Sequence, residues 1–326
     1  MTGGARVVTF GEVMLRLSPP RGERLFRSPE LRADFGGSEA NVAVALAHLD
    51  VPVEYVTRLP EGPLGDAALA ALAAEGVGTA WVQRGGERLG IYFIEPGADM
   101  GASRVVYDRA GSAFASLNPT SVDWVRVLEG ARWFHGSGIT PALGDGPRAA
   151  LGAAITAARG QAVAVSLDLN YRPALWQGRD PRAVIGPLVE GIDLLIGNRD
   201  AIRAMLGVEA EDPSVAAQLV ARFGCRRVAI TRREVVSATA HGWSAELYDG
   251  PTGAAWASRR YERRVVDRVG GGDSFAAGLI AALLAERPPE AAVEFAAAAG
   301  ALKLSVAGDW NRATPEEVDR LVRACT

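Results

Sequence analysis

Residues 267–275 read DRVGGGDSF, and the apolar segment FAAGLIAALLA begins at Phe275. Three consecutive glycines, Gly270, Gly271 and Gly272, lose much conformational freedom on folding, so they indicate a backbone that must come close to another group. A glycine turn that opens a helix directs several backbone N–H groups, and the positive end of the helix dipole, at one point. The segment therefore predicts an anion site at a helix start, with the carboxylate of Asp273 fixed beside it.

An anion site beside a fixed carboxylate suits the transfer of a phosphoryl group to an alcohol. The N–H groups stabilise the transferring group, and Asp273 accepts the hydroxyl proton. The simpler alternative is a tight turn in which Asp273 caps the helix, a common role of aspartate. The segment is not a Walker A loop, because no Gly-Lys-Ser/Thr follows it. It is not a dinucleotide-binding fingerprint either, because no second βαβ unit comes after it.

The composition is that of a globular protein, and we expect one α/β domain over residues 1–326, with a net charge of −3 and 48% hydrophobic residues. The charge balance gives no sign of the basic face that nucleic-acid binding requires. Two cysteines and three histidines lie too far apart for a disulfide framework or a zinc site. The N-terminus lacks the pattern of a secretory signal, and no apolar run of about 18 residues indicates a membrane helix. We therefore expect a cytoplasmic protein with no nucleic-acid or membrane partner.

Apolar strand-like segments alternate with amphipathic helical segments along most of the chain. ARVVTFGEVMLRL (residues 5–17) predicts a buried first strand, whereas NVAVALAHLDV (41–51) and GDAALAALAAEGV (65–77) predict helices. The alternation continues from residue 131 to residue 233, which favours βαβ units and a largely parallel sheet. Extended segments within about 12–36 and 88–115 break this rhythm, and we expect them to form a small β lid beside the main sheet.

Two motifs resemble those of a known family. DRVGGGDSFAAGL (267–279) resembles the C-terminal signature of the ribokinase-like (PfkB-type) carbohydrate kinases, which usually reads D-x-x-G-A-G-D, with Gly271 here in place of the alanine. DFGGSEANVAVALAHL (34–49) resembles the glycine pair and asparagine-led helix near the N-terminus of that family. The resemblance covers nearly the whole chain. It implies an α/β fold: a ribokinase-like three-layer α/β/α core with a mostly parallel sheet, plus a small β-sheet lid.

The resemblance also implies roles for residues of these two motifs. Gly270–Gly272 would form the anion hole, and Asp273 would be the catalytic base. Gly36, Gly37 and Asn41 would approach the sugar. Considered alone, the glycine pair is better explained by a simple loop turn.

Within the family the chain is most similar to the 2-keto-3-deoxygluconate kinases, and SLDLNYRPALW (166–176) carries this resemblance. The segment ends a predicted parallel strand, and ligands bind at the C-terminal ends of such strands, so we expect Asp168, Asn170 and Arg172 to face the substrate. A sugar acid offers a carboxylate that Arg172 can bind in a bidentate manner, whereas a neutral sugar needs no guanidinium group. The alternative is that Arg172 pairs with Asp168 or with an acid at the surface.

The resemblance places further substrate contacts in the expected lid and near the C-terminus. Tyr92 in GIYFIE, and Tyr107 and Arg109 in VVYDRAGSA, would contact the sugar acid. Residues two apart on a strand face the same side, so Tyr107 and Arg109 suit a polyhydroxy carboxylate, and they equally suit a solvated hairpin face. In SVAGDWNRATPEEV (305–318), Asp309 matches a second acidic residue at the substrate.

On the nucleotide side, LLIGNRDAI (194–202) resembles the family's Asn-x-x-Glu element, with Ala201 in the position of the glutamate. The turn that begins at Thr231 has Arg232 and Arg233 where many members have Thr-x-Gly-x-x-Gly. The residues expected at the nucleotide are Asn198, Thr231, Arg233, Gly270 and Gly272. The resemblance implies ATP as co-substrate and Mg²⁺. The departures leave the metal ligands and the nucleotide preference open, and activation by a monovalent cation is undecided.

The predicted function is the ATP-dependent phosphorylation of the C6 hydroxyl of 2-keto-3-deoxygluconate. A kinase of the galactonate epimer, or of a neutral sugar such as fructose or ribose, would use the same fold. A catalytically silent sugar-binding relative is a third alternative, which Ala201 favours and the intact Asp273 disfavours. The sheet edge of the lid favours a homodimer through the lid, or a higher assembly built from such dimers.

Overall fold

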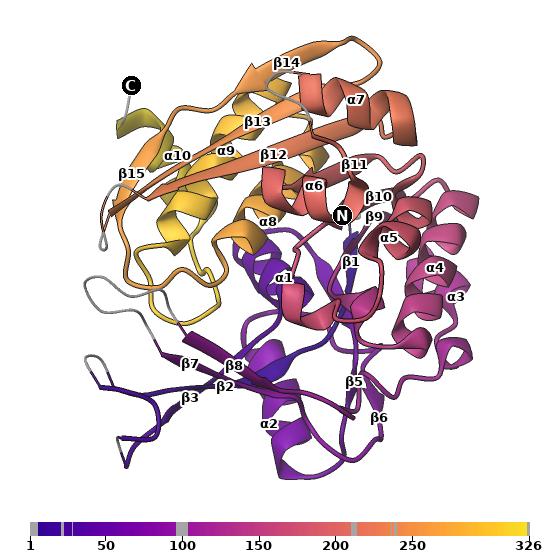
Figure 1. Cartoon of the computed structure of the whole chain (residues 1–326), viewed down its shortest axis with the longest axis vertical. Helices are drawn as coiled ribbons and strands as arrows, with labels where there is room; N and C mark the ends of the chain where they lie inside the picture. Colours follow the sequence, from indigo (N-terminus) through magenta and orange to yellow (C-terminus); the bar gives the residue numbers. More distant parts are fainter. Residues whose placement is uncertain are drawn as a thin grey trace.

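The computed structural model describes residues 6–20, 23–27, 29–95, 104–209, 214–235, 237 and 240–324. A large sheet runs through the middle of the molecule with helices on both faces, and a small sheet stands to one side (Figure 1). None of the helices in the described ranges is long and apolar enough to cross a membrane.

The large sheet is mostly parallel. Its order is β14-β13-β12-β11-β10-β9-β1-β4, with β15 also paired to β13. The six strands from β4 to β12 run parallel, and β13, β14 and β15 add an antiparallel end. The strands are β1 (Arg6–Phe10), β4 (Val53–Val56), β9 (Ala131–Ser137), β10 (Ala164–Asp168), β11 (Leu194–Gly197), β12 (Arg227–Val235), β13 (Ala240–Asp249), β14 (Ala254–Ala257) and β15 (Tyr261–Arg264). The central strands are nearly continuous apolar runs, because helices cover both faces of the sheet.

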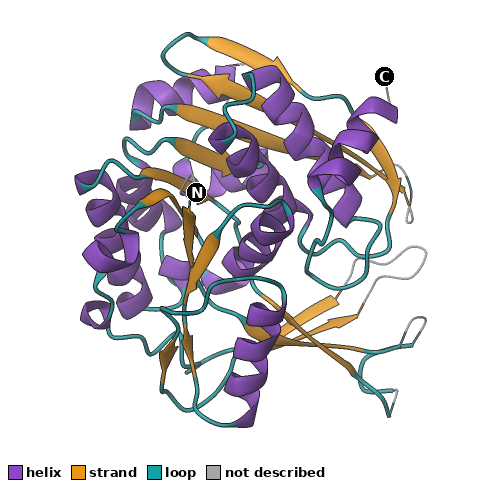
Figure 2. Cartoon of the chain, turned by 180° about the vertical axis from the view of Figure 1, so that it is seen from behind, coloured by secondary structure: helices purple, strands orange, loops and turns teal. Residues whose placement is uncertain are grey.

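Two separate hydrophobic clusters, one on each face of the sheet, make three layers (Figure 2). One face packs against α1 (Ser38–His48), α2 (Pro63–Ala74), α8 (Gly271–Leu284), α9 (Pro289–Lys303) and α10 (Pro315–Ala324). The other packs against α3 (Trp124–Leu128), α4 (Asp145–Gly160), α5 (Pro181–Val189), α6 (Arg199–Leu206) and α7 (Ser214–Phe223). The three-layer core expected from the sequence is therefore confirmed. Short 3₁₀ turns are η1 (Pro119–Ser121), η2 (Thr140–Ala142) and η3 (Pro173–Leu175).

The small sheet has the order β3-β2-β7-β8 and lies at the lower left of Figure 1. Its strands are β3 (Arg32–Gly36), β2 (Met14–Ser18), β7 (Ile91–Glu95) and β8 (Arg104–Asp108). They come from the two segments that interrupt the helix–strand alternation of the sequence. A further pair, β5 (Arg58–Leu59) and β6 (Gln83–Arg84), lies apart from both sheets.

The single first strand predicted over residues 5–17 is wrong. The segment forms β1 in the large sheet and β2 in the small one, and the chain changes sheets between Phe10 and Met14. Gly11 lies at this change, where a Cβ would be 2.0 Å from Oε2 of Glu39 in α1. Both halves are apolar, so the hydrophobic pattern alone does not show that they belong to different sheets.

Candidate active site

A cavity of about 690 Å³ opens between the small sheet, the ends of β10 and β11, and the start of α8. This is the edge at which ligands bind in parallel α/β sheets. Most of the residues singled out from the sequence line it: Gly37, Asn41, Tyr92, Tyr107, Arg109, Asp168, Asn170, Arg172, Asn198, Thr231, Arg233, Gly270, Gly272, Asp273 and Asp309. The cavity therefore brings together segments from most of the length of the chain.

The three glycines of the turn have different surroundings. Gly270 has φ +84°, and a Cβ there would lie 2.2 Å from the carbonyl oxygen of Asp309. Gly271 lies outside the cavity lining, where a Cβ would be 3.3 Å from Leu304. A Cβ at Gly272 would meet nothing within 4 Å. Gly270 thus has to be glycine for backbone reasons, whereas the missing side chain of Gly272 leaves open space at the helix start.

Gly36 and Gly37 are also closely surrounded. A Cβ at Gly36 would lie 2.2 Å from Oδ2 of Asp309 and 2.9 Å from the hydroxyl of Tyr92. A Cβ at Gly37 would lie 2.0 Å from the carbonyl oxygen of Glu12. The glycine pair lets the start of α1 approach Asp309 and the small sheet.

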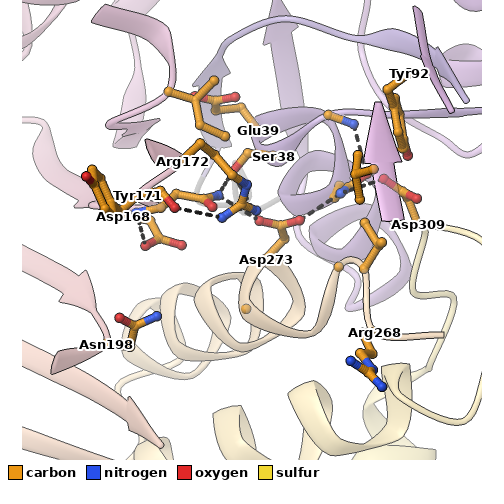
Figure 3. A pocket seen from close by; sticks show the side chains of 18 of the residues that line it. Ser38, Glu39, Tyr92, Asp168, Tyr171, Arg172, Asn198, Arg268, Asp273 and Asp309 are labelled. Carbon is orange, nitrogen blue, oxygen red and sulfur yellow. Dashed lines mark hydrogen bonds between the residues drawn. The ribbon is translucent and has the colours of Figure 1, made fainter. Parts of the chain in front are cut away.

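Asp273 is buried in the first turn of α8, and its carboxylate is held by donors from two other segments (Figure 3). Ser38 Oγ donates to Oδ1 at 3.0 Å, and Asn41 Nδ2 donates to Oδ2 at 2.7 Å. Asn170 Nδ2 lies 3.4 Å from Oδ1 and donates to Ser38 Oγ at 2.6 Å. Burial raises the pKa of Asp273 to about 6, against the opposing effects of Asn41, Arg172 and Ser38. Asp273 is therefore ionised at neutral pH but is a stronger base than an exposed aspartate.

Arg172 reaches toward Asp273 from the loop after β10 (Figure 3). Its side chain is exposed, and Nη1 donates to the carbonyl of Tyr171 at 3.2 Å. Within the described ranges it forms no ion pair with Asp168 or any other acid. The guanidinium group therefore has no acid at ion-pair distance among these residues, although its charge lowers the pKa values of Asp273 and Asp168.

Arg109 lies just past the end of β8 and is buried. Its Nε donates to Oε2 of Glu12 at 2.8 Å, and its Nη2 contacts the same oxygen. The guanidinium carbon is 5.6 Å from the centre of the Tyr107 ring, and the rings of Tyr92 and Tyr107 are 6.0 Å apart. The two tyrosines and Arg109 thus form one wall of the cavity, with the charge of Arg109 already paired.

Arg16 of β2 links the small sheet to the glycine turn, a role that was not predicted from the sequence. It is buried, with Nη1 2.5 Å from Oδ1 of Asp309 and Nη2 2.5 Å from Oδ2 of Asp267. Asp309 is therefore fixed from the side opposite the cavity, and Asn41 Nδ2 lies 3.4 Å from its Oδ2. Burial raises the pKa of Asp309, although Arg16 acts in the opposite direction.

Basic residues line the part of the cavity beyond the glycine turn. Asn198 caps α6 through its Oδ1, which accepts from the N–H of Ala201 at 2.8 Å, so its amide nitrogen remains available. Thr231, Arg233 and Arg268 line this part, and the nearby charges of Arg268 and Arg172 add to burial in lowering the pKa of Arg233. Such mutual repulsion of cations is relieved by a polyanionic ligand. Arg268 was not singled out from the sequence.

A model of the pfkB family of carbohydrate kinases matches residues 5–316. The chain is a pfkB family carbohydrate kinase. Over 98% of its length it is 35% identical to a 2-dehydro-3-deoxygalactonokinase of Haloferax volcanii, of which the match covers 97%. Among solved structures, a 2-dehydro-3-deoxygluconokinase of Thermotoga maritima superposes with a TM-score of 0.94 at 43% identity, with 98% of this chain and 99% of that one covered. A 2-dehydro-3-deoxygluconokinase of Thermoproteus tenax is 29% identical over 98% of this kinase and 94% of the relative. The family and the ribokinase-like fold expected from the two motifs are confirmed.

Two further buried acids lie near Asp273 in this kinase. Burial raises the pKa of Asp168 to about 7, and the charge of Asp273 adds to the effect. Burial raises the pKa of Glu39 to about 7 as well, against hydrogen bonds from Ser137 and Thr140. Asp168 accepts from the N–H of Asn170 at 3.0 Å. At a pKa of about 7, Asp168 is partly protonated at neutral pH, so its carboxyl group can both donate and accept hydrogen bonds.

Three of the residues that were not predicted from the sequence, Ser38, Glu12 and Arg16, pair with residues that are distant in the chain. Ser38 and Arg268 lie inside the two quoted motifs, at positions to which the resemblance assigned no role, and Glu12 and Arg16 lie outside both motifs. A buried charge on a short apolar strand, as at Arg16, is the one signal that was available, because such a charge requires a partner.

Proposed function

We propose that this kinase phosphorylates the terminal C6 hydroxyl of 2-keto-3-deoxygluconate, also named 2-dehydro-3-deoxygluconate, with ATP. The observation that carries the choice of a sugar acid is the exposed guanidinium group of Arg172 at the cavity, which forms no ion pair within the described ranges. A neutral sugar would offer this guanidinium group no opposite charge, whereas the carboxylate of a sugar acid would pair with it. The names of the relatives in Haloferax, Thermotoga and Thermoproteus support the same class of acceptor.

In the proposed complex the sugar acid lies between the small sheet and the loop after β10. Arg172 binds its carboxylate, and Tyr92, Tyr107 and Asp309 contact its hydroxyl groups. Arg109, whose charge Glu12 already balances, serves as a hydrogen-bond donor through its remaining N–H groups and not as the main carboxylate partner. The small sheet covers the acceptor and excludes water, which would otherwise compete for the phosphoryl group.

Asp273 is the proposed general base. As the acceptor oxygen attacks the γ-phosphorus atom, its proton passes to the Asp273 carboxylate, the bond to the β–γ bridging oxygen breaks, and ADP leaves. The N–H groups at Gly270–Gly272 and the start of α8 stabilise the charge on the transferring group. Ser38 and Asn41 orient the carboxylate, since each donates to one of its oxygens.

The nucleotide would lie over Thr231, Arg233 and Asn198. Mg²⁺, when bound, neutralises phosphate charge, and it is held largely by phosphates and water in such sites. Among the described residues, no group of three or more His, Cys, Asp or Glu side chains is placed to hold a metal. Asn198 has its oxygen engaged as a helix cap, and Asp200 is the carboxylate that lines this part of the cavity.

An ATP-consumption assay with purified protein and Mg²⁺ tests the proposal. The acceptors are 2-keto-3-deoxygluconate, its galactonate epimer, fructose and ribose, and the variant is Arg172→Ala, with Arg148→Ala on the exposed side of α4 as control. We expect turnover with the keto-deoxy acids alone. Arg172→Ala should lower their kcat/KM at least about tenfold, because hydrogen bonds to charged groups contribute about 1.5–3 kcal/mol. Turnover with fructose or ribose, unaffected by Arg172→Ala, would contradict it.

The assembly is a separate part of the proposal. Val105 and Tyr107 on the edge strand β8 are partly exposed, as is Phe26 in the segment between β2 and β3. We propose that a second copy covers this edge, in a homodimer formed through the small sheet. Light scattering on the wild type and on Val105→Glu would test it, since the variant should be monomeric.

A further inference from the structure

Lys303 is the one lysine among the 35 Lys and Arg residues of the chain, and it is the last residue of α9. Its side chain is completely buried, at 0% exposure, although lysine is almost never fully buried without a partner. In a chain that otherwise uses arginine for its cations, a single buried lysine indicates a position where a compact ammonium group is required.

The lysine side chain lies directly behind the glycine turn. A Cβ at Gly270 would be 3.2 Å from Cε of Lys303 and 2.2 Å from the carbonyl oxygen of Asp309. The ammonium group donates a hydrogen bond of 3.0 Å to the carbonyl of Val306. Lys303 therefore contacts both the turn and the loop 304–309 that packs against it.

Asp267 joins the same two segments through its two carboxylate oxygens. Its Oδ1 accepts from the N–H of Val269 at 3.1 Å, and its Oδ2 accepts from the N–H of Gly308 at 3.1 Å. The N–H of Val266 donates to the carbonyl of Leu304 at 2.7 Å. The residues just before the glycine turn are thus tied to loop 304–309 at several points.

The charges of this buried cluster balance when Lys303 is included. The cluster contains two carboxyl groups, those of Asp267 and Asp309; Arg16 pairs with both, and Lys303 supplies the second cationic group. Burial lowers the pKa of Lys303, and Asp267 and Asp309 act in the opposite direction. Without Lys303 the cluster would carry one net negative charge immediately behind the proposed anion site, where it would repel a phosphate.

We propose that Lys303 is a positioning residue for phosphoryl transfer: an internal cation that holds loop 304–309 against the glycine turn and balances Asp267 and Asp309. On this proposal the ammonium group supplies the positive charge that balances Asp267 and Asp309, so the kinase needs no monovalent cation from solution to form its anion site. This inference rests on the proposed function, because it assumes that the turn binds the γ-phosphate of ATP.

The test compares wild type with Lys303→Met, which keeps a similar length of side chain without the charge. Arg287→Met is the matched control, because Arg287 is a half-buried cation that pairs with Asp319 and packs on Phe295 of α9, away from the cavity. Turnover is measured in chloride salts of choline, Na⁺, K⁺ and NH₄⁺. The affinities for MgATP and for AMP are measured by calorimetry without an acceptor.

We expect the wild type and Arg287→Met to turn over equally, within about twofold, in all four salts. Lys303→Met should lose about 10–100-fold in kcat in choline chloride, as supporting residues of a site typically do, with little change in KM for the sugar acid. K⁺ or NH₄⁺ should restore part of the loss. The affinity of Lys303→Met for MgATP should fall while that for AMP stays constant. Wild-type stimulation of several-fold by K⁺ or NH₄⁺, or full activity of Lys303→Met in choline, would overturn the inference.

A second measurement does not depend on the folding of the variant. Protein labelled with ¹³C-lysine gives one side-chain signal, because Lys303 is the one lysine. MgATP should shift this signal and AMP should not, whereas no shift with MgATP would overturn the inference. Both binding measurements omit the acceptor. A wild type that binds MgATP but phosphorylates no sugar acid would therefore refute the proposed function and leave the role of Lys303 to be decided by these data.

Discussion

The burial and the hydrogen bonds of the Asp273 carboxylate determine both its orientation and its pKa. Its carboxylate is buried and receives hydrogen bonds from Ser38 and Asn41, so it cannot turn away from the cavity. Burial raises the pKa of Asp273, whereas these donors and the charge of Arg172 lower it, and the resulting value is about 6. A base with that pKa is ionised at neutral pH and close to the optimum for accepting a proton from an alcohol.

Asp273→Asn should reduce kcat by about 10²–10⁴-fold, the usual contribution of a general base. The asparagine keeps the shape of the side chain and removes a buried charge, so the melting temperature should not fall. Asp145→Asn is the control, because Asp145 is likewise an acid in the first turn of a helix but is exposed. Steady-state kinetics and thermal unfolding of both variants provide the measurement. Near-normal turnover of Asp273→Asn would remove Asp273 from the mechanism.

The same pKa predicts the acidic limb of the pH profile. Below a pH of about 6 the Asp273 carboxylate becomes protonated and cannot accept the hydroxyl proton. The kcat/KM for the acceptor should therefore be level above pH 7 and fall as the pH is lowered through 6, approaching tenfold per pH unit. Initial rates from pH 5 to pH 8 at saturating MgATP would show this. A limb centred near pH 4 would mean that burial does not raise the pKa of the base.

At the level of elements, the start of α8 depends on glycines that serve different purposes. Gly270→Ala places a Cβ against the carbonyl of Asp309 at a φ of +84°, and such strain costs about 1–3 kcal/mol. We expect this variant to be both unstable and inactive. Gly272→Ala adds a methyl group to a helical position with open space in front of it, and alanine favours a helix over glycine by about 0.5–1 kcal/mol.

Gly272→Ala should therefore keep or raise the melting temperature while turnover and MgATP affinity fall, because the methyl group occupies the space of the phosphate. Gly152→Ala in α4 is the control for the gain in helix stability, since its Cβ would have one contact, at 3.9 Å from Leu188. Thermal unfolding and kinetics of the three variants separate the two roles. Full activity of Gly272→Ala would show that the open space is not used by a ligand.

The elements that were correctly predicted are those defined by local pattern. The alternation of strands and helices, and the glycine turn that opens α8, follow from residues that are adjacent in the sequence. The division of residues 5–17 between β1 and β2 cannot be predicted in this way. Both halves are apolar, and their separation depends on which strands lie beside them. β2 pairs with β7 in parallel, and no local sequence signal predicts a pairing between segments so far apart in the chain.

The sequence predicted most of the residues that line the cavity, but not the ion pairs and hydrogen bonds between them. The motifs named most of the residues that line the cavity. They did not show that Glu12 balances Arg109, that Arg16 bridges Asp267 and Asp309, or that Lys303 lies behind the turn. Each of these pairings is long-range and depends on the assembled fold, and a charge alone does not identify its partner.

For the whole molecule, the buried acids of the site make stability and activity respond to pH in opposite directions. The folded-state pKa values of Glu39 and Asp168 are raised to about 7, and that of Asp273 to about 6. In the unfolded chain these groups release their protons near pH 4. The folded state therefore binds more protons between pH 5 and pH 8, and the free energy of unfolding should rise as the pH is lowered from 8 to 6.

This trend has a lower limit. Burial lowers the pKa of His135 to about 3, so below about pH 6.5 the unfolded chain gains a proton at this residue that the folded chain does not. One histidine opposes three acids, so stability should level off and pass through a maximum only near about pH 3.5, where the unfolded chain also protonates its acids. Melting temperatures in buffers from pH 4 to pH 8 should rise by a few degrees from pH 8 to pH 6. Glu39→Gln should be more stable than the wild type at pH 8, and its melting temperature should rise less as the pH is lowered.

A melting temperature that is constant or falls from pH 8 to pH 6 would mean that the pKa values of these acids are not raised. If melting temperatures follow the expected trend, the buried carboxylates of the site destabilise the folded protein at neutral pH when no ligand is bound. A ligand that brings positive charge or hydrogen-bond donors to these carboxylates would reduce this destabilisation.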